Sequence, residues 1–473
     1  MQRLKIILLI AIFNILGSIF DICSAKVTLP RMFSDGMVLQ RESKVNLWGN
    51  ANANSTIKIS PSWSKIKYTA TAGHDGKWKI SLPTPEAGGP YSITFNDGEK
   101  LTLSNILIGE LWICAGQSNM EMPMEGFKGQ PVENAVEDIM HANDNNLRLF
   151  TVKRNSQLQP VDTVSGGWSS AYPDAVRQFS ATAYYFGKEL RNALKVPVGL
   201  IVTSWGGSSC ESWMDPDWFK AFPETKIPKT QTDIWSPNRT ATVLYNGMLH
   251  PLIGITMRGV IWYQGEDNVP RYKTYADMLS TMIKGWRDKW GEGDFPFYYC
   301  QIAPYDYSLI NWDCNSAYLR EQQSKVETMV PNTDMACLLD AGLKYGIHPR
   351  KKSIAGMRLA MLALQKTYGI KGLGAENAVY KNVTFSNDTA IISFNRSRMW
   401  VYGEHGMYSD NFEIAGADKV FHHAKAWIDR NKVYVKSDSV KAPVAVRYAF
   451  HDWVDADLFH NGLPISSFRT DNW

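Results

Sequence analysis

The chain has 473 residues, of which 44% are hydrophobic and 20% are charged, so a disordered or fibrous protein is excluded. At about 150 residues per domain, this length predicts roughly three domains. The formal net charge is only +4, and no long basic run concentrates it, which argues against a nucleic-acid partner.

The first 25 residues have the order typical of a secretory signal. Arg3 and Lys5 precede a largely apolar stretch from Ile6 to Phe20, and the small residues Cys23-Ser24-Ala25 follow. The stretch is short for a membrane span. We expect residues 1–25 to be removed and the protein to be secreted or periplasmic. No later run approaches the roughly 18 apolar residues of a spanning helix, so no stable membrane span is expected.

The rest of the chain divides into three parts by pattern. Residues 26–105 carry short apolar runs between Gly, Asn, Asp and Pro turns, which predicts a small β-sandwich-like domain. In residues 106–375, continuously apolar strands alternate with helical stretches, which predicts an α/β domain whose parallel sheet is covered by helices on both faces. Residues 376–473 return to a β-rich pattern. The expected strands of the α/β part are Leu107–Cys114, Val198–Ser204, Gly259–Tyr263, Phe297–Ile302 and Met335–Leu339. Its expected helices are Ala183–Leu194, Tyr272–Trp290, Ala317–Met329 and Lys351–Tyr368.

The cysteines predict neither a zinc site nor a disulfide framework. Cys114, Cys300 and Cys337 lie in apolar strand candidates and are expected to be small core residues. Cys210 and Cys314 leave a disulfide open, because the sequence does not decide whether they pair. No metal or other cofactor is expected.

Chemically useful residues gather at the ends of the predicted strands, where open α/β sheets bind their ligands. They are Ser118 after the first strand, Gly206 and Gly207 after the second, Gln264 and Glu266 after the third, and Asp340 followed by His348 after the fifth. A serine hydrolase needs a nucleophilic hydroxyl, a histidine base and donors for the developing oxyanion, and this set contains all three. A single serine in such a place is more often a helix cap, so the indication comes from the joint placement.

Several separate sequence blocks resemble the sialate O-acetylesterase family, which belongs to the SGNH (GDSL-like) hydrolase superfamily. The blocks are Gly116-Gln117-Ser118-Asn119-Met120, Ser204-Trp205-Gly206-Gly207, Trp262-Tyr263-Gln264-Gly265-Glu266 and Ile347-His348-Pro349. Flanking segments are also similar, namely 33–41, 296–298 with 301–305, and 462–464 with 468–470. The resemblance therefore covers nearly the whole mature chain. It implies an SGNH-type parallel sheet between helices.

The resemblance also implies roles for individual residues. Ser118 would be the nucleophile and His348 the general base, while Gly207 and Gln264 would complete an oxyanion hole with the Ser118 N–H. The family pattern places an Asp two residues before the histidine, where this chain has Gly346. We expect Asp340 to orient His348 instead. Glu266 is the second candidate, and a dyad oriented by a backbone carbonyl is the third.

The sequence therefore predicts an exported serine esterase that removes O-acetyl groups from carbohydrates through an acetyl-serine intermediate. The substrate is either sialic acid or a plant polysaccharide such as xylan or xyloglucan. A sialate carboxylate calls for a nearby arginine, for which Arg258, Arg271 and Arg350 are candidates, although each is more often a surface charge. The alternative is a catalytically impaired carbohydrate-binding protein on the same fold, which the departure at Gly346 favours.

Overall fold

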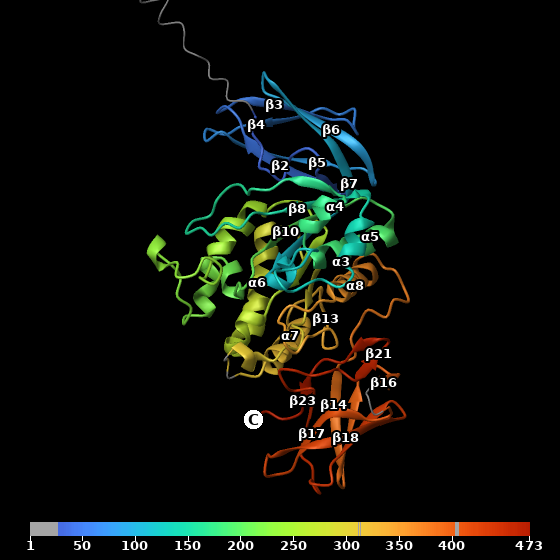
Figure 1. The fold of residues 1–473 in the computed structure, drawn as a ribbon. Helices are drawn as coiled ribbons and strands as arrows, with labels where there is room; N and C mark the ends of the chain where they lie inside the picture. Colours follow the sequence, from blue (N-terminus) through green and yellow to red (C-terminus); the bar gives the residue numbers. More distant parts are fainter. Residues whose placement is uncertain (1–26, 311, 313, 403–405) are drawn as a thin grey trace, which may run out of the picture.

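The computed structural model describes residues 27–310, 312, 314–402 and 406–473. The predicted signal peptide, residues 1–25, lies outside the described residues. Within the described part, no helix is long and apolar enough to cross a membrane. The chain forms a β-rich N-terminal part, a central α/β part and a β-rich C-terminal part, stacked in that order along the molecule (Figure 1).

The N-terminal part packs its short strands around one apolar core. Its strands are β1 (Val38–Gln40), β2 (Lys44–Asn50), β3 (Thr56–Pro61), β4 (Tyr68–Thr71), β5 (Lys77–Pro83) and β6 (Gly88–Asn96). β2 pairs with β5, while β3 pairs with both β4 and β6. Along β2, buried Val45 and Leu47 alternate with more exposed residues, so one face of the β2–β5 ribbon enters the core.

One long strand, β7 (Lys100–Gly116), joins the N-terminal part to the central part. Its beginning pairs with β6, and its continuation lies in the central sheet between β10 and β11. Its burial changes from interrupted to continuous at Ile106. The predicted boundary at residue 105 therefore falls inside a strand. The sequence becomes continuously apolar there because β7 enters the central sheet, not because the strand ends.

The central sheet has the strand order β13-β12-β11-β7-β10-β8-β9 and is parallel except for β9. The further strands are β8 (Asp144–Thr151), β9 (Trp168–Ala171), β10 (Val198–Ser204), β11 (Gly259–Tyr263), β12 (Phe297–Cys300) and β13 (Thr333–Ala336). The helices are α2 (Ser118–Glu121), α3 (Ala135–Met140), α4 (Pro173–Gln178), α5 (Ala181–Leu194), α6 (Tyr275–Trp290), α7 (Ala317–Met329) and α8 (Lys352–Leu362). Short 3-10 helices span Cys210–Trp213, Pro216–Ala221, Gln231–Asp233, His250–Leu252, Glu266–Thr274 and Tyr307–Ile310, and π-helical turns span Tyr245–Leu249 and Ala363–Thr367.

Helices cover both faces of this sheet, as the continuously apolar strands predict. In β11, Val260 and Trp262 belong to the same core as α6, whereas Ile261 and Tyr263 belong to the core that contains α5 and α8. Since successive strand residues point to opposite faces, a strand buried by both layers must be apolar throughout. This confirms the predicted mixed α/β class.

The C-terminal part is an antiparallel sheet with the order β14-β15-β19-β18-β17-β20-β23, beside a smaller sheet of β16, β21 and β22. These strands are β14 (Tyr380–Ser386), β15 (Thr389–Phe394), β16 (Met399–Val401), β17 (Ser409–Ala415), β18 (Phe421–Asp429), β19 (Lys432–Lys436), β20 (Ala445–Tyr448), β21 (Leu458–His460), β22 (Leu463–Pro464) and β23 (Phe468–Arg469). Buried Arg320 of α7 attaches this part by donating to Ser467 Oγ at 2.9 Å and to the Ala449 carbonyl at 3.3 Å.

A buried carboxylate, Glu110 of β7, fastens the N-terminal part to the central sheet. It accepts hydrogen bonds from Gln40, Arg41, Arg258 and Tyr368 at 2.5–3.0 Å, and its side chain is fully buried. Burial alone raises the pKa of this carboxyl. The hydrogen bond and charge of Arg258, with Arg41 and Gln40, nevertheless hold the pKa below its ordinary value of 4.5.

We predict that Glu110→Gln lowers the free energy of unfolding by about 2–4 kcal/mol, because two arginines lose their buried anion. Urea unfolding at pH 7 measures the loss. In the parent protein, this contribution should disappear as the pH falls through the lowered pKa of Glu110, because protonation removes the anion. Glu42→Gln is the control, since the Glu42 side chain is 57% exposed where it meets Arg41. Equal stability of the two variants would contradict the assignment.

Candidate functional site

Ser118 lies where β7 leaves the sheet, as the first residue of the short helix α2. The preceding residue ties this turn to the neighbouring strand β11. The Gln117 N–H donates to the Tyr263 carbonyl at 2.9 Å, and Gln117 Oε1 accepts from the Gly265 N–H at 3.1 Å. Ser118 itself is partly exposed. The turn thus presents a hydroxyl at the carboxyl edge of the sheet from a braced backbone.

The next residue, Asn119, joins the serine turn to the loop that carries His348. Its buried side-chain Nδ2 donates to Glu266 Oε1 at 2.5 Å and to the Ile347 carbonyl at 3.2 Å, while its Oδ1 accepts from Lys352 Nζ. The neighbour of Ser118 is therefore bonded directly to the neighbour of His348. The structure brings together these two segments, which are far apart in the sequence.

The His348 ring is held by the loop that follows α2. Its Nδ1 lies 2.5 Å from Gln130 Oε1, and its ring meets Phe127 edge-on with centroids 5.1 Å apart. An amide oxygen only accepts hydrogen bonds, so Nδ1 carries the proton and Nε2 keeps a free lone pair. Burial, followed by the charge of Lys352, lowers the pKa of His348 from 6.5 to about 4. The ring is therefore a neutral base at ordinary pH.

The prediction that Asp340 orients His348 is wrong. Both carboxylate oxygens of Asp340 accept from the Arg358 guanidinium of α8, at 2.6 and 2.7 Å. Glu266, the second candidate, accepts from Asn119 instead. The third candidate, a backbone carbonyl, is replaced by the side-chain amide oxygen of Gln130.

The loop after β10 passes directly over Ser118. The Gly206 N–H donates to Glu121 Oε2 at 2.7 Å, so α2 also fixes this loop. A side chain at Gly206 would place its Cβ 3.3 Å from the Ser118 Cβ and 2.9 Å from Glu121 Oε2. Gly207 has a φ of +68°, which favours glycine. Within the described residues, the Ser118 and Gly207 N–H groups donate to no protein acceptor.

Gln264 does not act as the predicted oxyanion donor. Its side chain is completely buried. Both Nε2 protons are used, toward the Ser208 carbonyl at 3.1 Å and Asn268 Oδ1 at 2.7 Å, and its Oε1 accepts from the Tyr275 hydroxyl. An amide nitrogen has only two protons to donate. Gln264 instead holds Ser208, the residue after Gly207, in place.

A buried pair of opposite charge lies beneath the site. The Lys352 side chain is almost completely buried, and its ammonium lies 5.8 Å from the centre of the Tyr263 ring. Burial lowers the pKa of Lys352 from 10.5 to about 7, against the attraction of Glu266. Burial also raises the pKa of Glu266 above 4.5. The Asn119 side chain bonds both groups, and these hydrogen bonds help to offset the cost of burying them.

A groove of about 920 Å³ opens beside the glycine loop. Arg239 connects the two, because its Nε donates to the Gly207 carbonyl at 3.3 Å and lies 2.7 Å from Asp267. Arg271 also binds Asp267, at 3.1 Å. The aromatic residues of the groove are Phe222, Trp235, Tyr272 and Trp312, of which Trp235 is 71% exposed. The groove thus offers ring faces and partly exposed guanidinium groups.

The three arginines considered for a substrate carboxylate have different positions. Arg271 lines the groove. Arg258 binds Glu110 where β7 enters the central sheet, at the edge opposite Ser118. The Arg350 carbonyl accepts from the Glu133 N–H, and the residue is exposed. Only Arg271 of these three is placed to meet a ligand in the groove.

The predicted core cysteines Cys114, Cys300 and Cys337 are buried, as expected. Cys210 is a buried free thiol beside Met282, so a bridge to Cys314 is not formed. Across the residues that the structure describes, no group of three or more His, Cys, Asp or Glu side chains is arranged to hold a metal ion.

Sequence reasoning missed Asn119, Glu121, Gln130 and Lys352. Asn119 and Glu121 lie one and three residues after Ser118, so the sequence alone placed them near the site. It did not show their partners in distant loops. Lys352 lies four residues after His348 at the start of α8, which puts it near that loop. Nothing in the sequence pointed to Gln130 itself. The glycine at position 346 showed only that the usual acidic partner of the histidine is missing.

Comparison with known proteins agrees with this geometry. A family model described as "Carbohydrate esterase, sialic acid-specific acetylesterase" matches residues 108–353. The chain is 26% identical to the sialate O-acetylesterase of Homo sapiens, with 92% of this chain and 91% of that protein aligned. It is 29% identical to the sialate O-acetylesterase of Rattus norvegicus, with 73% and 74% aligned.

A solved structure resembles nearly the whole chain. The crystal structure of a carbohydrate acetylesterase from Xanthomonas citri superposes with a TM-score of 0.86 and 36% sequence identity, covering 95% of this chain and 100% of that one. With the family match, this establishes a carboxylic ester hydrolase that acts on acetylated carbohydrates. The chain belongs to the carbohydrate esterase family of sialic acid-specific acetylesterases.

Proposed function

We propose that this protein removes O-acetyl groups from a glycan by a serine mechanism, with Ser118 as nucleophile and His348 as general base. The observation that carries the proposal is that α2 binds both other parts of the site. Asn119 bonds the histidine loop at Ile347, and Glu121 bonds the glycine loop at Gly206. A nucleophile, a neutral base and two unused N–H donors thereby share one rigid support.

In the first half-reaction, the Ser118 oxygen attacks the acetyl carbonyl carbon while His348 Nε2 takes the hydroxyl proton. The carbonyl oxygen becomes an oxyanion, which the Ser118 and Gly207 N–H groups stabilise. Collapse breaks the ester bond, and the imidazolium gives its proton to the departing sugar oxygen. In the second half-reaction, water attacks the acetyl-serine by the same route and releases acetate and free Ser118.

Gln130 does in this site part of what an acid does in a serine triad. Its oxygen fixes the tautomer that leaves Nε2 free, as the acid of a triad does. A neutral amide does not stabilise the imidazolium by charge. It therefore does not offset the burial and the Lys352 charge that lower the pKa of His348.

The acetylated sugar lies in the groove beside Gly207 under this proposal. The exposed face of Trp235 suits the C–H face of a pyranose ring, and Arg239 and Arg271 supply hydrogen-bond donors. The mammalian relatives are named for sialate, a sugar acid that an arginine would recognise. Acetylated xylan and xyloglucan are the alternative substrates, and assays with all three kinds of ester distinguish them.

We also propose that residues 1–25 are a secretory signal and that the mature enzyme acts outside the cytoplasm. Support comes from the basic residues Arg3 and Lys5, the apolar stretch that follows, and the small residues that end at Ala25. The N-terminal sequence of the exported protein tests this.

We predict that Ser118→Ala lowers kcat for acetate release from an acetylated sugar by on the order of 10⁵-fold, because the nucleophile is lost. Release of acetate is measured enzymatically, and the folded state is checked by circular dichroism. Equal rates for the parent protein and the variant would exclude the mechanism.

Replacing Asn119 by alanine should impair both stability and catalysis. It leaves buried Glu266 and Lys352 without their shared partner, which should lower the free energy of unfolding by about 3 kcal/mol. It also frees the histidine loop, which should lower kcat about 100-fold through misplacement of His348. Asn143→Ala, at an exposed position, is the matched control. Full activity of Asn119→Ala would show that the histidine loop is positioned by other contacts.

The pH dependence of kcat/KM should reflect the low pKa of His348. The reaction needs a neutral imidazole, so kcat/KM should be flat near neutrality and should fall only as the pH drops through about 4. A break near 6.5 would contradict the burial of this ring.

Gln130→Glu provides a second test of the same pKa. A carboxylate at Nδ1 favours the imidazolium, so this variant should move the acidic limb upward by at least about one pH unit. Gln231→Glu makes the same charge change at an exposed position and should leave the limb in place.

A further inference from the structure

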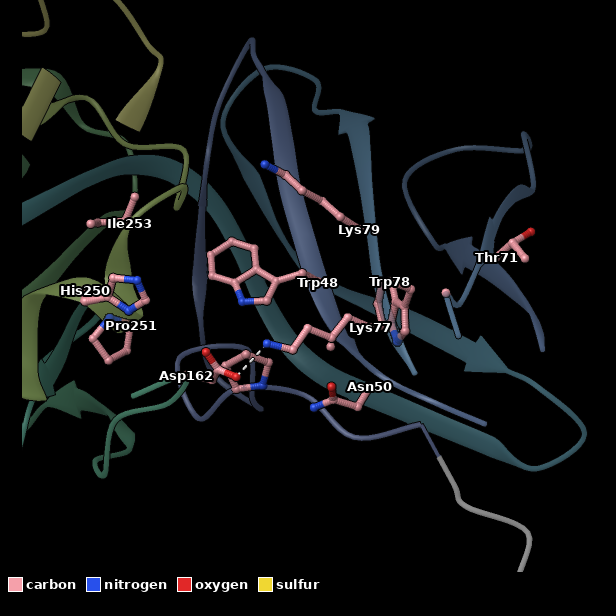
Figure 2. Close-up of a pocket in the computed structure, with 13 residues that line it drawn as sticks. Trp48, Asn50, Thr71, Lys77, Trp78, Lys79, Asp162, His250, Pro251 and Ile253 are labelled. Carbon is pink, nitrogen blue, oxygen red and sulfur yellow. Dashed lines mark hydrogen bonds and ion pairs between the residues drawn. The ribbon is translucent and has the colours of Figure 1, made fainter. Parts of the chain in front are cut away.

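A second concavity lies between the N-terminal part and the central part of the molecule (Figure 2). It has a volume of about 620 Å³. Its lining from the N-terminal part is Pro30, Trp48, Gly49, Asn50, Thr71, Gly73, Lys77, Trp78 and Lys79, and its lining from the central part is Asp162, His250, Pro251 and Ile253. Nothing in the mechanism uses this space.

The outer face of the β2–β5 ribbon forms one wall. Trp48 lies opposite Lys79, and Asn50 lies opposite Lys77, so these four side chains share a face, away from the core residues of β2. The same face docks onto the central part at its other end, where Asn46 donates to the Gly254 carbonyl at 3.1 Å. The ribbon is thus anchored at one end and leaves a cavity at the other.

The groups that line the cavity are held in place by contacts around its rim. The half-buried Trp48 ring meets Phe33 edge-on with centroids 4.7 Å apart, which fixes the indole. Lys77 and Asp162 form an ion pair at 2.8 Å across the two parts (Figure 2). His250 Nδ1 lies 3.1 Å from the Val161 carbonyl. Because these side chains are already held in place, a ligand would not lose binding free energy by ordering them.

We infer that this cavity binds a segment of a carbohydrate chain. An indole held rigidly at the wall of a cavity packs well against the C–H face of a pyranose ring. Carboxylate, ammonium and amide groups at its rim, from Asp162, Lys79 and Asn50, match the hydroxyl groups at the edge of such a ring. The volume lies within the range of small-molecule sites.

The sugar bound here is not the one that loses its acetyl group. His250–Ile253 precede β11, which runs parallel to β7, with Tyr263 beside Gly116 at the end near Ser118. The five residues of β11 span roughly 16 Å, so the cavity lies toward the opposite edge of the sheet. The cavity is thus a non-catalytic site, in addition to the proposed active site, and it holds the glycan elsewhere along its length.

Affinity electrophoresis tests this with fully de-acetylated polymers, namely xylan, xyloglucan and a polysialic acid. These probes contain no ester, so the result does not depend on whether Ser118 is catalytic. We expect at least one polymer to retard the parent protein, and Trp48→Ala to weaken that binding by about tenfold. Retardation by xylan or xyloglucan would indicate a site for a neutral glycan, and retardation by polysialic acid would indicate a site for an acidic one.

Lys79→Ala is the second variant, because Lys79 is exposed and its loss leaves the core of the ribbon intact. It should also weaken retardation. Trp400→Ala, at a tryptophan that is 61% exposed on β16, is the matched control and should bind as the parent does. All variants should hydrolyse a small acetyl ester at the parent rate. Retardation by no polymer, or unchanged retardation of both cavity variants, would overturn the inference.

Discussion

The site depends on one constraint: four residues of helix α2 hold three segments of the chain together. Ser118 begins the helix, Asn119 bonds the histidine loop, and Glu121 bonds the glycine loop. Any movement of α2 therefore moves Ser118, the histidine loop and the glycine loop as one unit. Such rigidity suits electrostatic catalysis, in which donors must point at the developing charge before it forms.

Electrostatics beneath the site complement this geometry. Lys352 and Glu266 are both buried, and neither would be stable there alone. The amide of Asn119 serves both, with its oxygen toward the ammonium and its nitrogen toward the carboxylate. The charge of Lys352 also helps to keep His348 neutral. A buried lysine thus helps to set the protonation state of the proposed base.

The apolar and polar pattern of the sequence predicted the sheet and the segments of the site, but not the hydrogen-bond partners of individual residues. Continuously apolar strands predicted the covered parallel sheet, and strand ends predicted the segments that meet at Ser118. β8 and β9 were not predicted, because Asp144–Thr151 begins with polar residues and Trp168–Ala171 is short. The predictions that were wrong concern residues whose role depends on which side chain they bind. Asp340 was predicted to orient His348 but binds Arg358. Gln264 was predicted to donate in the oxyanion hole, but both of its amide protons are donated inside the protein. A sequence shows which donors exist, whereas only the fold shows which are already used.

The central claim is that Ser118 and His348 act as one catalytic pair, and a fluorophosphonate probe tests it most directly. Intact-mass spectrometry and peptide mapping follow the reaction of the parent protein and of His348→Ala. A single adduct should form on Ser118, and it should form orders of magnitude more slowly when the imidazole is absent. An unlabelled Ser118, or a labelling rate that is the same without His348, would contradict it.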